Sequence, residues 1–277
     1  MRARLKQRST ASAPRLPLPP EPMGASPPRI LAIAGSDSSG GAGIQADIKT
    51  ITMLGGYAMT AITAVTAQDT TGVHAVAVLS PELVVAQIDA CLGDIGADAV
   101  KIGMLGSAQI AQAVANRLEG ADFPIVFDPV MVATSGSLLA DAETVAAFEL
   151  LMKLATLTTP NVAELAALGG DGAMAARGIA YLAKGGDATG PEVEDRLCVP
   201  GRNPISWRAP RIATRHNHGT GCTLSSAIAT GLGCGLDLAD AIARAREFVR
   251  AALEAAPGYG AGRGPMGHQA VRTGGPD

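Results

Sequence analysis

Short apolar segments alternate with helical patterns from Arg29 onward, and this alternation limits the possible folds more than any other feature. Apolar runs of strand length occur at residues 30–35, 59–68, 74–79, 97–105, 124–132 and 154–161. Helical patterns lie between several of them, at residues 43–54, 81–93, 107–120 and 141–154. Strands that alternate with helices at this spacing form a mostly parallel sheet with helices on both faces. The sequence therefore predicts an α/β fold.

The composition agrees with buried strands. Aromatic residues make up only 3% of the chain, so the core must consist of Ala, Val, Ile and Leu, as buried parallel strands prefer. Residues 193–214 have the pattern of two antiparallel edge strands joined by a turn. Residues 237–256 have the pattern of an amphipathic surface helix.

Charge and cysteine content limit the partners and the compartment. The chain has 22 basic and 25 acidic residues, a formal charge of -3, so we expect no nucleic-acid partner. The apolar runs are far shorter than the ~20 residues of a membrane span, so we expect no membrane partner. The four cysteines form no C-x-x-C pair, which predicts reduced thiols and a cytoplasmic protein.

The two ends of the chain differ from its centre. Residues 1–28 are basic and proline-rich without an apolar segment, which predicts a disordered N-terminal extension and not a secretory signal. Met23 is as plausible a start of translation as Met1. We expect one folded domain over residues 29–268 and a C-terminal tail over 269–277.

Polar or glycine-rich stretches follow several of the expected strands. They are GSDSSGG, TAQDT, KIGML, FDPVM and TPNVAE. Ligands of open parallel sheets bind beyond the carboxyl ends of the strands. The sequence therefore predicts a ligand site at this edge of the sheet.

The stretch HNHGTGCTLSSAIATGLG, residues 216–233, places a Gly-Thr-Gly turn before a helix of small residues. The first N–H groups of a helix have no partner within the helix, and glycines let an anion approach them, so Gly219 and Gly221 predict an anion site. A cysteine at a helix start has a lowered pKa, which predicts thiolate character for Cys222. The alternative is a glycine turn with a structural cysteine. We expect His218 to be an ordinary loop histidine as readily as a residue that orients the loop.

Several motifs together carry a family resemblance. They are GSDSSGGAGIQADIKT (35–50), KIGML (101–105), DPVMVATSG (128–136), TPNVAE (159–164), KGGD (184–187) and HGTGCTLSSAIA (218–229). In this order they resemble the hydroxymethylpyrimidine and phosphomethylpyrimidine kinases of thiamin biosynthesis, in the ribokinase-like superfamily. The resemblance covers about residues 29–268, and it includes a closing motif at 260–268.

The resemblance implies a ribokinase-like domain with a central, mostly parallel sheet. It implies phosphorylation of 4-amino-5-hydroxymethyl-2-methylpyrimidine and then of its monophosphate. ATP with Mg²⁺ would be the donor, and a homodimer would be the assembly.

The resemblance also implies roles for individual residues. The pyrimidine would be lined by Gly35, Asp47, Gln68, Met104 and Val130. The phosphoryl group would meet Gly219, Gly221 and Cys222, where Cys222 acts as a base or positions the attacking hydroxyl. The nucleotide would meet Lys184, Asn161 and Thr220, and the metal would meet Glu164 and Asp128.

Simpler explanations exist for five of these residues. Met104 also fits a plain core position. Asp47 also fits charge complementarity at a helix start. Asn161 and Glu164 also fit a helix cap with its capping-box glutamate. Lys184 also fits a charge at the end of a strand.

Two other functions are consistent with the sequence. A pyridoxal or pyridoxine kinase shares the Gly-Thr-Gly-Cys turn. A non-catalytic pyrimidine-binding protein is suggested by the stretch between Glu164 and Lys184, which is shorter than usual in the family. Asp187, Thr134 and Ala261 also depart from the family pattern, so we expect differences on the nucleotide side of the site.

Overall fold

The computed structural model describes residues 15–17, 26–133, 136 and 139–274. Within these residues, one nine-stranded sheet has the order β10-β9-β8-β7-β6-β5-β2-β3-β4. Its strands are β2 (Arg29–Asp37), β3 (Tyr57–Gln68), β4 (Val73–Val78), β5 (Ala99–Ile102), β6 (Ile125–Phe127), β7 (Leu157–Thr158), β8 (Tyr181–Ala183), β9 (Glu192–Cys198) and β10 (Ile205–Pro210). The six neighbouring strands from β3 to β8 in this order are parallel, and β4, β9 and β10 are antiparallel to their neighbours.

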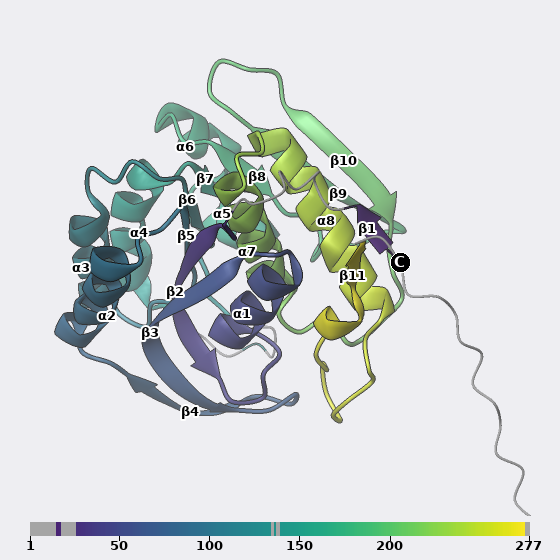
Figure 1. Cartoon of the computed structure of the whole chain (residues 1–277). Coiled ribbons are helices and arrows are strands. Elements are labelled where there is room, and N and C mark those ends of the chain that lie inside the picture. The colour runs from purple at the N-terminus through teal and green to yellow at the C-terminus, as the bar shows by residue number, and fades with distance from the viewer. Residues whose placement is uncertain (1–14, 18–25, 134–135, 137–138, 275–277) are drawn as a thin grey trace, which may run out of the picture.

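Helices cover both faces of the sheet (Figure 1). One layer contains α2 (Pro81–Asp94), α3 (Ala108–Leu118) and α4 (Ala142–Leu154). The other contains α1 (Gly43–Met53), α7 (Thr220–Gly233) and α8 (Leu238–Glu254). Two short helices, α5 (Val162–Ala167) and α6 (Gly170–Ala176), connect β7 to β8, and the 3₁₀ helix η1 (His268–Ala270) follows α8.

The central strands are apolar on both faces, as the alternating pattern requires. In β2, Leu31 and Ile33 belong to the core under α2, α3 and α4. Ile30 and Ala32 belong to the core under α1, α7 and α8. Successive side chains of a strand point to opposite faces, so a strand buried on both faces has no polar face. The α/β prediction is confirmed.

Several of the predicted strand segments are longer than the observed strands. The apolar run 124–132 predicts a long strand, but β6 ends at Phe127. Asp128 and Pro129 follow, and a proline has no N–H to donate to a neighbouring strand. The predicted antiparallel pair within 193–214 is confirmed as β9 and β10, but only β10 lies at the edge of the sheet.

Part of the expected N-terminal extension is described as a strand. Residues Arg15–Pro17 form β1, which pairs in parallel with β11 (Arg272–Gly274) in the expected C-terminal tail. The remaining positions of 1–25, with Met1 and Met23, lie outside the described residues, as do Thr134 and 275–277. In the part of the chain that is described, no helix is both long enough and apolar enough to cross a membrane.

Candidate active site

The Gly-Thr-Gly turn opens α7 at the carboxyl edge of the sheet. Gly219 has φ 87°, a left-handed conformation that favours glycine, and it caps α7 without a side-chain hydrogen bond. A Cβ at Gly219 would overlap the carbonyl oxygen of Gly41, so the two glycine-rich loops touch backbone to backbone. Within the described residues, the amides of Gly221 and Cys222 have no hydrogen-bond acceptor. The turn therefore offers free N–H groups at a positive helix end, as an anion requires.

A lysine and two carboxylates lie beside this turn. A Cβ at Gly221 would lie 3.3 Å from Lys184 Nζ and 3.4 Å from Asp128 Oδ2. Lys184 Nζ is 2.6 Å from Asp128 Oδ1 and 3.8 Å from Glu164 Oε2. Burial opposes the charge on Lys184, but Asp128 and Glu164 outweigh it and raise the pKa of this lysine above its usual range. The ends of β6, β7 and β8 thus place a stable cation next to the anion turn.

Glu164 both caps helix α5 and has a raised pKa. Asn161 and Glu164 form a capping box at the start of α5, in which each side chain accepts from the other residue's backbone N–H. The simpler explanation of this pair is therefore correct, and it leaves a metal role open. Burial raises the pKa of Glu164 to about 7, because Lys184 only partly offsets it and Asp128 adds a negative charge nearby.

The two carboxylates fit a magnesium ion. Mg²⁺ prefers oxygen ligands, and it usually takes one or two carboxylates together with waters and substrate phosphates. Asp128 and Glu164 supply two such groups, which lie 2.6 Å and 3.8 Å from Lys184 Nζ. Over the described ranges, no group of three or more His, Cys, Asp or Glu side chains could enclose a metal by itself.

Asp47 does not line the site as the sequence predicts. Its carboxylate is 0% exposed, and both oxygens lie 2.9 Å from Lys101 Nζ, which is also 0% exposed. Ser226 Oγ donates to the same carboxylate at 2.7 Å. Asp47 therefore ties α1 to β5 and α7 beneath the anion turn. A direct contact between this side chain and the pyrimidine is inconsistent with its burial.

The predicted thiolate at Cys222 is also wrong. Burial raises the pKa of Cys222 to about 11, and the nearby Lys101 offsets this only in part. The carboxylates of Asp47 and Asp128 raise the pKa further, while the N–H of Gly43 lowers it. A position at a helix start favours the thiolate, but loss of water outweighs that effect here. Cys222 is a neutral thiol at neutral pH, so its predicted role as a base would require a change of its surroundings by the ligand.

We expect this neutral thiol to be visible in alkylation rates. The thiolate is the reactive form, so the rate of Cys222 modification by iodoacetamide should rise about tenfold per pH unit from pH 7 to 9. Peptide mass spectrometry can follow Cys222 separately from the exposed Cys234. A rate for Cys222 that is already constant above pH 7 would mean that the thiol is ionised, contrary to this expectation.

The expected pyrimidine residues meet at the ends of β2, β3 and β5. A Cβ at Gly35 would lie 2.9 Å from Met104 Sδ, so the bare glycine leaves room for this half-buried methionine. Thr63 Oγ1 donates to the carbonyl oxygen of Met104 at 2.7 Å and holds it in place. Gln68 is half-buried at the end of β3, and Val130 is half-buried two residues beyond Asp128. The roles of Gly35, Gln68, Met104 and Val130 toward a substrate remain predictions.

The sequence singles out neither Asp37 nor Lys101 beside the turn, and it leaves open whether His218 orients the loop. His218 is buried, with Nε2 2.9 Å from Asp37 Oδ2 and 3.2 Å from the Gln68 amide. Asp37 organises the loop after β2, and Lys101 lies under the turn. A signal for Lys101 was present, because a lysine in the strand AVKI is unusual among buried apolar residues. For Asp37, the position at the end of a buried strand was the only signal.

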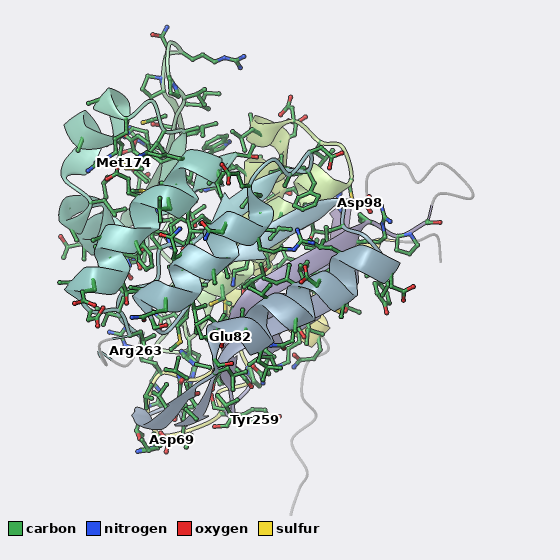
Figure 2. All side chains as sticks on the ribbon, turned by 90° about the vertical axis from the view of Figure 1, so that its left-hand side faces the viewer. Asp69, Glu82, Asp98, Met174, Tyr259 and Arg263 are labelled. Carbon is green, nitrogen blue, oxygen red and sulfur yellow. The ribbon has the colours of Figure 1, made fainter. Side chains whose placement is uncertain are left out.

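The closing motif packs against the loop between β3 and β4. Arg263 N donates to the Thr70 carbonyl oxygen at 2.9 Å, and Gly262 N donates to Thr70 Oγ1 at 3.2 Å. His218 N also donates to the carbonyl oxygen of Gly264 at 3.1 Å. Figure 2 shows Asp69, Tyr259 and Arg263 at the same end of the molecule. The segment 259–268 therefore joins the loop after Gln68 to the anion turn.

A groove of about 690 Å³ extends from Lys184 along the start of β9. Asn161, Gly185 and the loop 188–191 are among the residues that line it. Arg211 holds this loop from behind by donating to the carbonyl oxygens of Gly186 at 2.6 Å, Ala188 at 2.6 Å and Gly190 at 2.9 Å. The groove thus begins at Lys184 beside the anion turn, and the Arg211 guanidinium holds the loop 188–191 that lines its other end.

Comparison with known proteins agrees with this arrangement. A family model described as phosphomethylpyrimidine kinase matches residues 37–267. A hydroxymethylpyrimidine/phosphomethylpyrimidine kinase of Rhizobium meliloti (strain 1021) is 47% identical over 255 residues, covering 86% of this chain and 96% of the relative. Its counterpart of Streptomyces coelicolor is 43% identical over 266 residues, covering 91% and 97%.

Solved structures confirm the predicted ribokinase-like fold. A Bacillus subtilis pyridoxal kinase, solved as an ADP complex, is 34% identical with a TM-score of 0.81, covering 88% of this chain and 98% of that one. A phosphomethylpyrimidine kinase of Clostridium difficile 630 is 36% identical with a TM-score of 0.68, covering 80% and 97%. Because the family match spans most of the chain and these relatives align along nearly their whole length, the chain belongs to the phosphomethylpyrimidine kinase family.

Proposed function

We propose that this enzyme transfers phosphate from ATP to the hydroxymethyl group of 4-amino-5-hydroxymethyl-2-methylpyrimidine, and then to the resulting monophosphate, in thiamin diphosphate biosynthesis. The curated relatives carry this activity in their names. The observation that carries the proposal is the open turn at Gly219–Cys222 with Lys184 at its side. Phosphoryl transfer needs mainly positioning and neutralisation of charge, and this turn supplies both.

Each group at the site has a distinct part in this reaction. The free amides of Gly221 and Cys222 would hold the equatorial oxygens of the transferred phosphoryl group. Lys184 would neutralise charge on the phosphates from the other side. Mg²⁺, held through Asp128 and Glu164, would supply charge neutralisation between the donor phosphates. Cys222 would position the attacking hydroxyl as a neutral hydrogen-bonding thiol.

We place the nucleotide in the groove that starts at Lys184. Asn161 and Lys184 line the start of this groove, and the loop held by Arg211 forms its outer part. Thr220, in the neighbouring turn, would meet the phosphates of the nucleotide. Solved relatives include a pyridoxal kinase with bound ADP and another with AMP-PCP, which supports ATP as donor. Helix α5 contributes Val162 and Leu165 to the wall of this groove.

Replacement of Arg211 by Met should weaken nucleotide binding selectively. The change leaves three loop carbonyls without their donor, so we expect the KM for ATP to rise about tenfold while the KM for the pyrimidine stays within about twofold. Steady-state kinetics with each substrate varied will measure this. Arg250→Met is the matched control, since among the described residues Arg250 donates only to the Pro210 carbonyl oxygen, and its loss should leave both KM values unchanged. Equal effects of Arg211→Met on both substrates would contradict the placement.

Product analysis tests the proposed function directly. The purified chain, incubated with the pyrimidine alcohol, ATP and Mg²⁺, should yield the monophosphate and then the diphosphate. The pyridoxal kinase alternative is favoured by one observation, the TM-score of 0.81 with the Bacillus subtilis enzyme. Pyridoxal turnover much faster than pyrimidine turnover in side-by-side assays would overturn the proposal. Magnesium-dependent ATP consumption excludes a non-catalytic binding protein.

We also propose a cytoplasmic enzyme that acts as a homodimer. All four cysteines are free thiols, which suits a reducing compartment. The edge strand β4 exposes Val76 and Val78, and an exposed apolar edge strand is suited to cover by a second copy. Light scattering of the purified chain measures the assembly.

A further inference from the structure

A chain of polar side chains joins the anion turn to the end of β3. His218 Nε2 lies 2.9 Å from Asp37 Oδ2 and 3.2 Å from one end of the Gln68 amide. The other end of this amide lies 3.2 Å from Thr66 Oγ1, which in turn lies 3.0 Å from the carbonyl oxygen of Ser36. Asp37, His218 and Thr66 are each 4% exposed, so water contributes little to these contacts.

Asp37 determines where the hydrogen of His218 lies. Its carboxylate accepts from Ser39 N and Oγ, Gly41 N and Ala42 N. Burial opposes the charge on Asp37, but hydrogen bonds from His218 and Ser39 outweigh it and hold the pKa of Asp37 below its usual value. A carboxylate can only accept, so His218 Nε2 must carry a hydrogen directed at Asp37. A protonated Nε2 has no lone pair for a second donor.

The Thr66 hydroxyl determines which end of the Gln68 amide can face it. It has one hydrogen, and the carbonyl oxygen of Ser36 can only accept, so that hydrogen is already used. Thr66 Oγ1 can therefore only accept from Gln68. With the amide nitrogen toward His218, two N–H groups would face each other, and the amide oxygen would face a hydroxyl with no hydrogen to give. With the nitrogen toward Thr66, the amide donates to Thr66 Oγ1, and with the oxygen toward His218, it shares the Nε2 hydrogen with the Asp37 carboxylate.

The imidazole cannot rotate to escape this condition. A Cβ at Gly41 would overlap the ring of His218, so the glycine loop packs directly against it. On the other side, the backbone of His218 is bonded to the carbonyl oxygen of Gly264 and bridged to Pro265. The ring is therefore fixed by the same segments that build the anion turn.

We infer that Asp37 and His218, together with Thr66, fix the orientation of the Gln68 amide and thereby select the ring edge that the substrate presents. The inference rests on the proposed function, in which Gln68 faces the pyrimidine. The free lone pair of Gln68 is then on the side of His218 and its free N–H on the side of Thr66. The reacting hydroxymethyl group must face the turn at Gly219–Cys222. A pyrimidine ring can therefore align its edge with the free lone pair and the free N–H of Gln68 in only one productive orientation. Asp37, His218 and Thr66 are positioning residues that act through Gln68.

The chemical consequence is discrimination between amino and oxo rings. A 4-aminopyrimidine presents a donor amino group beside an acceptor ring nitrogen. The corresponding 4-oxopyrimidine presents an acceptor oxygen beside a donor N–H, which is the reverse order. A site that hydrogen-bonds a substrate rejects an analogue that leaves its polar groups unpaired. An amide free to turn over would accept both rings.

Substitution of Thr66 tests this inference. Thr66→Val keeps the shape of the side chain but removes the acceptor of the amide nitrogen, so the amide keeps only its shared hydrogen bond with His218 and turns more easily. We expect the ratio of kcat/KM for the 4-amino over the 4-oxo alcohol to fall at least about tenfold, with the KM for ATP within about twofold. Thr66→Ser keeps the hydroxyl and should retain the wild-type ratio. A Thr66→Val ratio equal to that of Thr66→Ser would overturn the inference.

A second measurement needs no turnover. In the ¹⁵N spectrum of the histidine-labelled full chain at neutral pH, His218 Nε2 should have the shift of a protonated ring nitrogen. An unprotonated Nε2 would overturn the inference. If the chain phosphorylates neither alcohol while Nε2 is protonated, the proposed function has failed and the hydrogen-bond assignment has not. The two failures are therefore distinguishable.

Discussion

Gly219→Ala should lower the turnover number by about 10²–10³-fold, the loss typical when a positioned donor is removed from a transition state. Alanine is strained at φ 87°, and its Cβ would overlap the carbonyl oxygen of Gly41, which is backbone and cannot rotate away. The first turn of α7 would have to shift, and the amides of Gly221 and Cys222 would shift with it. Steady-state assays with the pyrimidine alcohol and ATP measure the loss.

Gly235→Ala is the matched control for Gly219→Ala. Gly235 also has a left-handed conformation, with φ 83°, but a Cβ there would meet no atom within 4 Å. Both substitutions introduce backbone strain of about 1–2 kcal/mol, and only Gly219 lies at the turn. We expect Gly235→Ala to lower the melting temperature slightly and to keep its turnover. Equal turnover of the two variants would show that the turn is not part of the site.

Lys101→Met should destabilise the fold by about 3–5 kcal/mol, because it leaves the buried Asp47 carboxylate without its cation. The hydrogen bond from Ser226 alone cannot replace a full charge at both oxygens. Urea unfolding of the purified variant measures the change in the free energy of unfolding. The double variant Lys101→Met, Asp47→Asn removes the unpaired charge and should recover a large part of the loss.

Lys153→Met provides the comparison on the surface. Lys153 pairs with Glu149 at 3.1 Å on α4, and the two side chains are 60% and 47% exposed. Exposed pairs of this kind contribute only about 0.3–0.5 kcal/mol. A Lys101→Met protein as stable as Lys153→Met would mean that the Asp47–Lys101 pair does not hold α1, β5 and α7 together.

The sequence predicted the layers of the fold because they depend on local patterns. The alternation of Leu31 and Ile33 with Ile30 and Ala32 needs only the strand period to indicate burial on both faces. The length of β6 was wrong because the apolar run continues through Pro129, where strand pairing stops. Patterns of hydrophobicity therefore located the elements better than their ends.

Predictions for the site were correct where they depended on neighbouring residues and wrong where they depended on residues far away in the sequence. The turn at Gly219 and Gly221 is encoded by neighbouring residues, and it lies where the sequence placed it. The pKa of Cys222 depends on burial and on charges from Asp47 and Asp128, far away along the chain, so a local argument gave the wrong direction. The burial of Asp47 likewise depends on Lys101, 54 residues away.

The contact between the two glycine-rich loops has a consequence for synthesis of the protein. His218 meets Asp37 across 181 positions, and Ser226 meets Asp47 across 179. When only about the first two hundred residues have left the ribosome, the loop that contains Gly41 is present but the turn at Gly219–Cys222 is not. We therefore expect the turn and the loop opposite it to come together only late in translation, after residues 216–233 have left the ribosome.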